Sequence, residues 1–262
     1  MEVVILADPA AVGSHTAELV ARRAAETPDM VLGIATGSSP LGTYRELARL
    51  HAQGDVTFDG VRCFALDEYV GLPERHPASY ALVVERELTT PLGLDPANVR
   101  TPDGSAADIQ QACLDYEHAL AASGGVDLQI LGIGTNGHIG FNEPTSSLAS
   151  RTRVKALSQQ TRMDNARFFA KGEDVPTHCI TQGLGTIMEA REIVLVAQGE
   201  AKAAAVAAAI EGPVSSMCPA SLLQFHPRTR IVLDEAAASG LTLADYHRFV
   251  AEAKHHFPGG TR

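Results

Sequence analysis

The part of the sequence richest in chemically useful side chains is LGIGTNGHIGFNEP at residues 131–144. It continues an apolar segment, residues 126–133, whose composition is typical of a buried parallel strand. The glycine-rich turn that follows carries His138 and Glu143, five residues apart. A histidine titrates near neutral pH and a nearby carboxylate can fix its tautomer, so this pair is suited to proton transfer. In open α/β sheets, ligands bind outside the carboxyl ends of the strands, where such a turn lies.

A second turn, TGSSP at residues 36–40, also follows an apolar strand and opens a helical segment, with Pro40 suited to the first helical position. The backbone amides of Gly37, Ser38 and Ser39, the two hydroxyls and the positive helix end could bind a phosphate. The alternative is that one serine only caps the helix. The turn lacks the Gly-Lys-Ser/Thr ending of a P-loop, so a site of that type is not indicated.

Three glycines in the first segment, Gly132, Gly134 and Gly137, match the GxGxxG pattern of dinucleotide-binding folds. The match lies in the middle of the chain rather than at its first strand–helix turn. Residues 150–157, where an acidic ribose ligand is expected, contain no acid. His138 follows the third glycine at once, which a cofactor-binding turn does not need. We therefore expect no nicotinamide cofactor.

The motif DEYVG places Asp67 directly after the third predicted strand. A single acid in such a position is often only a loop cap. Because the carboxyl ends of parallel strands meet at one edge of the sheet, Asp67 is expected near the turns at residues 36–40 and 131–144, which favours a catalytic role. Arg167 and Lys202 are isolated cations in helical patterns and, taken alone, are typical of solvated charges.

Basic residues alternate further along the chain. Arg151, Arg153 and Lys155 would lie on one face of an extended segment. With Ser146 and Ser147 just upstream, they could form a second anion site. The alternative is that these charges protect an exposed sheet edge.

Short apolar segments alternate with segments of helical spacing, which predicts βα units and a parallel sheet. The predicted strands are residues 3–7, 30–35, 61–66, 126–133, 153–157, 192–197 and 229–233. The predicted helices are residues 10–26, 43–51, 80–88 and 106–122, with one more after each of the last two strands. The pattern indicates an α/β fold with an open, mostly parallel, doubly wound sheet and helices on both faces, similar to a modified Rossmann fold. We expect a single domain over residues 1–262, with residues 258–262 as a disordered tail.

The composition narrows the class of protein. The chain has 262 residues, of which 45% are hydrophobic and 5% aromatic. Its formal net charge of −10 argues against a surface that binds nucleic acids or anionic membranes. The four cysteines are Cys63, Cys113, Cys179 and Cys218. Their wide spacing predicts reduced thiols and no metal site. The apolar runs at residues 3–7 and 203–210 are too short for a secretion signal or a membrane span, so we expect a cytoplasmic protein.

Taken together, these motifs resemble the glucosamine-6-phosphate deaminase family, also described as glucosamine/galactosamine-6-phosphate isomerases. The likeness runs from Val12 to about Glu235 and is carried above all by DEYVGLP at residues 67–73 and GHIGFNEP at residues 137–144. Further matching segments are residues 36–40, 146–155, 167–169 and 223–227. Members of the family isomerise and deaminate glucosamine 6-phosphate to fructose 6-phosphate and ammonia. The resemblance implies no metal and no organic cofactor.

The resemblance also implies residue roles. Asp67 would move a proton between C2 and C1 of the opened amino sugar. His138 would open the pyranose ring by proton exchange at the ring oxygen, oriented by Glu143 and the residue at position 136. The implied phosphate-binding residues are Gly37, Ser38, Ser39, Arg167 and Lys202. Many members have Asp at position 136, whereas Asn136 can accept a hydrogen bond but carries no charge. This difference bears on the pH profile and on how strongly His138 depends on Glu143.

In regulated bacterial members, the positions that bind N-acetylglucosamine 6-phosphate between subunits correspond to Met1, Ser146, Ser147, Arg153 and Lys155. The resemblance therefore implies a homo-oligomer, expected to be a hexamer, with sigmoidal kinetics relieved by that effector. The alternative is that these residues are surface charges on an unregulated enzyme.

Two other functions are alternatives to the deaminase. One is a 6-phosphogluconolactonase-type hydrolase, whose chemistry does not need a base for C–H abstraction. The other is a non-catalytic sugar-phosphate-sensing module.

Overall fold

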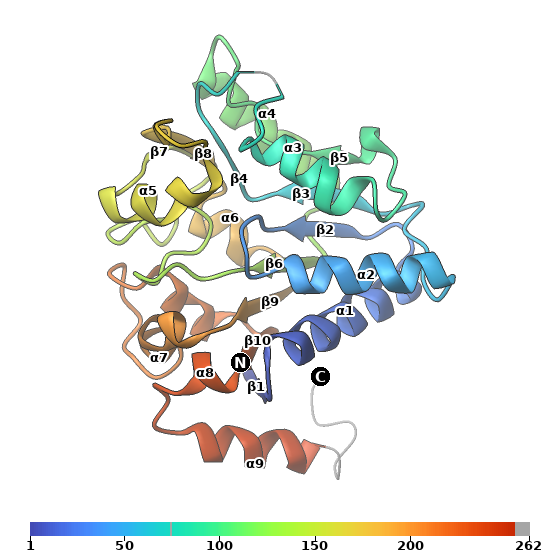
Figure 1. Cartoon of the computed structure of the whole chain (residues 1–262), viewed down its shortest axis with the longest axis vertical. Helices are drawn as coiled ribbons and strands as arrows, with labels where there is room; N and C mark the ends of the chain where they lie inside the picture. The colour runs from blue at the N-terminus through green and yellow to red at the C-terminus, as the bar shows by residue number, and fades with distance from the viewer. Residues whose placement is uncertain (74, 255–262) are drawn as a thin grey trace.

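A computed structural model describes residues 1–73 and 75–254 (Figure 1). The tail predicted at residues 258–262 lies outside the described residues. The larger sheet is built from β1 (Glu2–Leu6), β2 (Val31–Ile34), β3 (Arg62–Ala65), β5 (Val99–Arg100), β6 (Leu128–Leu131), β9 (Glu192–Ala197) and β10 (Thr229–Asp234). These seven strands follow the order β1-β10-β9-β6-β2-β3-β5, and every neighbouring pair is parallel. The predicted open, mostly parallel sheet is confirmed.

Helices cover both faces of this sheet, as a doubly wound fold requires. They are α1 (Pro9–Glu26), α2 (Leu41–Gln53), α3 (Tyr80–Val84), α4 (Ile109–Ala122), α5 (Gln159–Asn165), α6 (Leu184–Met188), α7 (Ala203–Ile210), α8 (Glu235–Ala238) and α9 (Ala244–Lys254). Apolar residues of α1 and α2, such as Val20 and Leu47, pack against one face of the central strands. Tyr116 of α4, Ile187 of α6 and Val206 of α7 belong to the core on the opposite face.

The sheet has a topological switch point between β2 and β6. These two strands are hydrogen-bonded neighbours. After β2 the chain adds strands on one side, through β3 and β5, and after β6 it adds β9 and β10 on the other side. The crossover connections therefore diverge at β2 and β6 and leave a crevice beyond their carboxyl ends, which is where open α/β sheets bind ligands.

A second, smaller sheet corrects the sequence prediction. Residues 153–157 were predicted as a strand of the parallel sheet, but β7 (Arg153–Ala156) pairs antiparallel with β8 (His178–Thr181), which in turn pairs antiparallel with β4 (Asp67–Tyr69). Neither β4 nor β8 was predicted from sequence. Both are short, and their pairing joins segments more than a hundred residues apart, so no local periodicity marks them. The small sheet packs on its own apolar cluster, which includes Tyr69, Phe141 and Cys179.

Several smaller expectations can be compared directly. Pro40 lies just before α2 rather than at its first position, and no side chain caps this helix, so neither serine of residues 36–40 serves as the cap. All four cysteines are free thiols, as predicted, and only Cys218 is not fully buried. In the described ranges no helix is long and apolar enough to cross a membrane.

Candidate active site

A pocket lies at the switch point, outside the carboxyl ends of β2 and β6. It contains about 750 Å³ of empty space, part of it open to solvent, which suits a small-molecule ligand. Its wall brings together the three sequence segments that were predicted to meet: residues 36–39, Asp67, and residues 132–135 with His138. Arg167 and Lys202, which looked like isolated cations in the sequence, also line it.

The turn after β2 forms one end of this pocket. Gly37 has a φ of +90°, which favours glycine, and a Cβ at this position would meet no atom within 4 Å, so open space lies in front of it. The serine hydroxyls do not cap α2, and Ser38 Oγ accepts a hydrogen bond from Arg167 Nη2 at 3.3 Å. Lys202 is partly buried, and this burial lowers the pKa of its ammonium group. Hydroxyls, a helix N-terminus and two cations therefore converge in a site suited to an anion.

The turn after β6 holds His138 against the pocket. A Cβ at Gly134 would lie between 2.2 and 2.4 Å from atoms of the His138 ring, so the imidazole packs directly on that glycine. Gly137 has a φ of +84°, and its amide donates to the carbonyl of Gly134 at 3.0 Å. Two glycines of the GxGxxG match thus shape a turn around an imidazole, which accounts for them without a dinucleotide.

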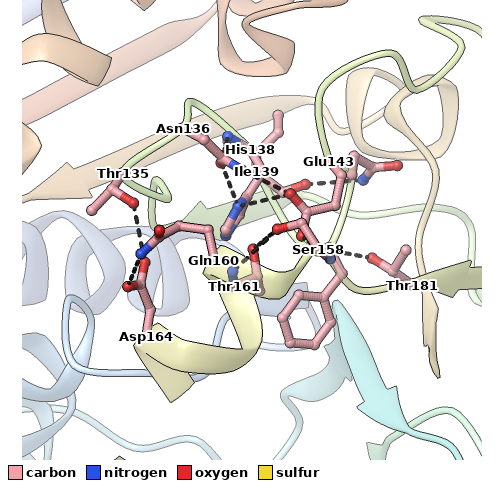
Figure 2. Close-up of polar contacts among 12 residues, drawn as sticks. Thr135, Asn136, His138, Ile139, Glu143, Ser158, Gln160, Thr161, Asp164 and Thr181 are labelled. Carbon is pink, nitrogen blue, oxygen red and sulfur yellow. Dashed lines mark hydrogen bonds and ion pairs between the residues drawn. The ribbon is translucent and has the colours of Figure 1, made fainter. Parts of the chain in front are cut away.

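Asn136 joins the histidine to the glutamate (Figure 2). Its Oδ1 lies 2.7 Å from His138 Nδ1 and also accepts from the His138 backbone amide at 3.2 Å. Its Nδ2 donates to Glu143 Oε2 at 2.8 Å. Because Oδ1 accepts, Nδ1 of the neutral imidazole carries the proton and Nε2 is the basic nitrogen. The carboxylate itself is 3.9 Å from Nδ1, so it acts on the ring mainly through the amide.

His138 and Glu143, at the two ends of this chain of hydrogen bonds, differ in what sets their charge. Burial lowers the pKa of His138, and it outweighs the opposing effect of Glu143. Burial alone would raise the pKa of Glu143, but hydrogen bonds from the Thr161 side chain and the Ser158 amide, together with His138 and Asn136, lower it. The site therefore holds a neutral imidazole beside an ionised carboxylate near pH 7.

The two adjacent carboxyls of β4 have different surroundings. Glu68 accepts hydrogen bonds from the amides of Tyr69, Tyr80 and Ala81 at 2.8–3.0 Å and so holds the start of α3. Asp67 lines the pocket, is only 5% exposed, and none of the described residues donates a hydrogen bond to its carboxylate. Burial, and secondarily the charge of Glu68, raise the pKa of Asp67 to about 8. When ionised, Asp67 is therefore an unusually strong carboxylate base.

The residues of the second predicted anion site have different surroundings. Arg153 donates to Asn142 Oδ1 at 2.7 Å. Ser146 is 2% exposed, and its hydroxyl has no hydrogen-bond partner in residues 1–73 and 75–254, whereas Ser147 is exposed. Lys155 lies two residues along β7 from Arg153, on the same face of the strand. Met1 precedes β1, at one edge of the larger sheet, and is not joined to the others by any hydrogen bond within the described chain.

Several pocket residues were missed in the sequence. Tyr80 of α3 and a group from the α5 region line the pocket; the group is Thr161, Asp164, Asn165 and Phe168. Asp164 accepts a hydrogen bond from Thr135 at 3.1 Å, which fastens α5 to the turn after β6 (Figure 2). In the sequence, only the neighbouring Arg167 indicated that the α5 region lies at the site. The reason is that α5 follows β7 of the small sheet, and the pairing of this sheet is not visible in the sequence.

The chain is similar in sequence to known proteins. The model of the family described as glucosamine-6-phosphate isomerases/6-phosphogluconolactonase matches residues 7–232. A curated glucosamine-6-phosphate deaminase of Cutibacterium acnes is 59% identical over 249 residues, covering 95% of each chain. One of Streptomyces coelicolor is 57% identical over 260 residues, covering 99% of this chain and 100% of the relative.

Solved structures show the same likeness. One described as a monomeric glucosamine-6-phosphate deaminase superposes with a TM-score of 0.89 at 39% identity, covering 92% of this chain and 100% of the other. A 6-phosphogluconolactonase from Trypanosoma cruzi reaches a TM-score of 0.74 at 16% identity, covering 92% of this chain and 97% of the other, so it shares the fold alone.

Proposed function

Because this chain belongs to the glucosamine-6-phosphate isomerase/6-phosphogluconolactonase family, we propose that it is a glucosamine-6-phosphate deaminase. It would convert glucosamine 6-phosphate to fructose 6-phosphate and ammonia. The observation that carries this proposal is Asp67, a buried carboxylate to which none of the described residues donates a hydrogen bond. It lies in the same pocket as a neutral histidine and a group of cations suited to an anion. The high identity to curated deaminases over nearly the whole chain supports it.

The first proposed step is ring opening by His138. The basic Nε2 takes the proton from the C1 hydroxyl and returns one to the ring oxygen, which gives the open-chain aldehyde. Asn136 fixes the tautomer that leaves Nε2 free, and Glu143 fixes Asn136. The imidazole begins and ends this step in the same protonation state, so it needs no net charge.

The second proposed step is proton transfer by Asp67. The C2 proton moves to the carboxylate while the ammonium group of the substrate gives a proton to the aldehyde oxygen, which forms a neutral enolamine. Asp67 then protonates C1, and the product is an iminium at C2. Water then adds to C2 and ammonia leaves, so one water is consumed for each ammonia released. The C2 proton is weakly acidic, which suits a carboxylate whose pKa burial has raised to about 8.

Phosphate binding would fix the substrate for both steps. Ser38, Arg167 and Lys202 line the pocket together, and the first turn of α2 contains no acid. The Asp164 carboxylate also lines the pocket and acts on Lys202. Binding energy at the phosphate is then available to hold C1 and C2 against the two proton-transfer groups.

The experiment compares substrates. Purified protein is assayed for ammonia release from glucosamine 6-phosphate and for hydrolysis of 6-phosphogluconolactone. We expect ammonia release and no lactone hydrolysis above the uncatalysed rate. Lactone hydrolysis without ammonia would favour the other branch of the family, and binding of a sugar phosphate without either reaction would favour a sensing module.

We also propose regulation, resting on the resemblance described for Ser146, Ser147, Arg153 and Lys155. An anion site for N-acetylglucosamine 6-phosphate is supported by the partly buried Arg153 guanidinium and by the buried hydroxyl of Ser146, which has no partner within the described part of the chain. The corresponding assembly is a homohexamer, to which Met1 contributes across subunits. Sedimentation and saturation curves with and without the effector test this: a monomer with hyperbolic kinetics that the effector does not change would contradict it and leave the deaminase proposal intact.

A cytoplasmic location remains a prediction.

A further inference from the structure

A row of three side chains crosses the smaller sheet beside the pocket. In the antiparallel register, Thr181 of the middle strand β8 lies opposite Asp67 of β4 and opposite Arg153 of β7. Residues directly opposite one another in antiparallel strands project their side chains to the same face. Asp67, Thr181 and Arg153 therefore present a carboxyl, a hydroxyl and a guanidinium side by side.

All three face the same segment, the tight turn after His138 that is closed by the bridge between Ile139 and Asn142. Thr181 Oγ1 accepts a hydrogen bond from the Phe141 amide at 3.0 Å, one of the contacts drawn in Figure 2. Arg153 Nη1 donates to Asn142 Oδ1 at 2.7 Å.

Gly140 fits between these groups only because it has no side chain. A Cβ there would lie 2.9 Å from Thr181 Oγ1 and 3.6 Å from Asp67 Oδ2, and the φ of +53° also favours glycine. The backbone of the turn thus lies directly over the carboxyl of Asp67. It covers part of this carboxyl, since Asp67 is only 5% exposed, and both Gly140 and Phe141 line the pocket beside it.

Gln182, the residue that follows β8, joins the same two parts of the site a second time. The Gln182 amide donates to the Leu66 carbonyl at 2.7 Å, immediately before Asp67. The Gln182 carbonyl accepts from Asn142 Nδ2 at 2.8 Å and from Thr181 Oγ1 at 3.2 Å. Asn142 Nδ2 also reaches the Ile139 carbonyl at 2.9 Å. The end of β8 is therefore bonded to the strand that carries Asp67 and to the turn that carries His138.

We propose that Thr181 is a positioning residue that sets the turn at residues 139–142 over Asp67 and so fixes the candidate base relative to His138. The inference rests on the proposed deaminase function. Thr181 is fully buried, and its hydroxyl is used both as an acceptor and as a donor. A valine would fill the same space in a buried strand, so packing alone does not require the hydroxyl.

The test replaces the hydroxyl and then restores it. Thr181→Val leaves the Phe141 amide without a partner, and we expect kcat to fall about 10- to 100-fold because a small displacement of the turn misplaces the reacting groups. KM should stay within about threefold of the wild type, since the phosphate site is untouched. Thr181→Ser keeps the hydroxyl and should recover most of the lost kcat.

Two further measurements separate positioning from a general loss of structure. Hydrogen exchange at the Phe141 amide should be faster in Thr181→Val and near the wild-type rate in Thr181→Ser. The pH dependence of kcat/KM should move to lower pH in Thr181→Val, because water gains access to Asp67. Thr16→Val is the matched control: Thr16 is also fully buried, but its hydroxyl donates to the Val12 carbonyl within α1, and we expect unchanged kcat per folded molecule.

Each result has a definite meaning. Wild-type kcat and wild-type Phe141 exchange in Thr181→Val would overturn the proposal, as would equal losses in Thr181→Val and Thr181→Ser. If Thr181→Val does not fold, Thr181→Ala is held to the same criteria. A wild-type protein that releases no ammonia would reject the proposed function instead, and the exchange of the Phe141 amide would still decide whether Thr181 holds the turn.

Discussion

Replacing Asp67 by Asn should make the folded protein more stable above pH 4 while it removes the base. The protonated carboxyl and the amide are nearly the same size, so the substitution changes charge more than shape. Burial raises the pKa of Asp67 from 3.8 to about 8, which means that the folded state binds this proton more tightly than the unfolded state does. Between these two pH values the unfolded chain has lost the proton and the folded chain has kept it, so the free energy of unfolding of the wild type falls as pH rises. Below pH 4 both states are protonated and this difference disappears.

The size of this stability difference follows from the pH range between the two pKa values, 3.8 and about 8. Each pH unit within it costs about 1.4 kcal/mol, so at pH 7 the burial of Asp67 costs the wild type at most ~4 kcal/mol. Relaxation and water entry around an ionised carboxylate reduce that ceiling, and we expect Asp67→Asn to gain about 1 to 3 kcal/mol over the wild type at pH 7 to 8. At pH 3.5 the two proteins should be equal within about 0.5 kcal/mol.

Urea unfolding at several pH values between 3.5 and 8 measures this difference, provided that both proteins have the same m-value. Asp59→Asn, at an exposed carboxylate outside the pocket, controls for the change from Asp to Asn itself. An Asp67→Asn variant that tracks the wild type at every pH would show that the Asp67 carboxylate is solvated. A variant less stable than the wild type at pH 8 would show that the ionised carboxylate has a stabilising partner. Either result would refute the description of Asp67 as a base raised by burial.

Three further predictions concern the rest of the pocket. Because Asn136 bridges His138 and Glu143, substitution of His138 by Gln, of Glu143 by Gln, and of both should cost similar factors in kcat, and multiplicative losses would show that the two act independently. Asn136→Asp places a charge 2.7 Å from His138 Nδ1, so it should raise the pKa of the imidazole, which an NMR titration of the His138 ring measures; an unchanged pKa would show that position 136 does not act on the ring through its charge. Arg167→Ala and Lys202→Ala should each raise KM for the phosphorylated sugar about 10-fold or more with little change in kcat, and an unchanged KM would place the phosphate elsewhere.

The larger sheet was predictable because its strands are locally marked. Residues 31–34 and 128–131 are short, mostly apolar segments followed by glycine-containing turns, and their length and flanking glycines identify them as strands. The small sheet was not predictable in this way. Its strand β4 begins with two acids, and β8 pairs with it across more than a hundred residues, so only the folded chain shows that Asp67 and Thr181 are partners.

The same distinction between local and long-range signals applies to the residues of the candidate site. Asn136, His138 and Glu143 lie within one turn, so their spacing in the sequence already indicated that they could meet, and they form one chain of hydrogen bonds. Asp67 was identified by its place at the end of a strand. Tyr80 and Asp164 were missed because they reach the pocket from helices attached to the small sheet, whose position is set by packing rather than by local sequence.

Ammonia release from glucosamine 6-phosphate in deuterium oxide, measured for the wild type and for Asp67→Asn, tests the central claim most directly. We predict that the wild type releases ammonia and that its fructose 6-phosphate carries deuterium at C1. Asp67→Asn should be slower by about 10² to 10⁴, while it still binds the sugar phosphate. Turnover by Asp67→Asn near the wild-type rate, with the same deuterium at C1, would contradict the assignment of the proton transfer to Asp67.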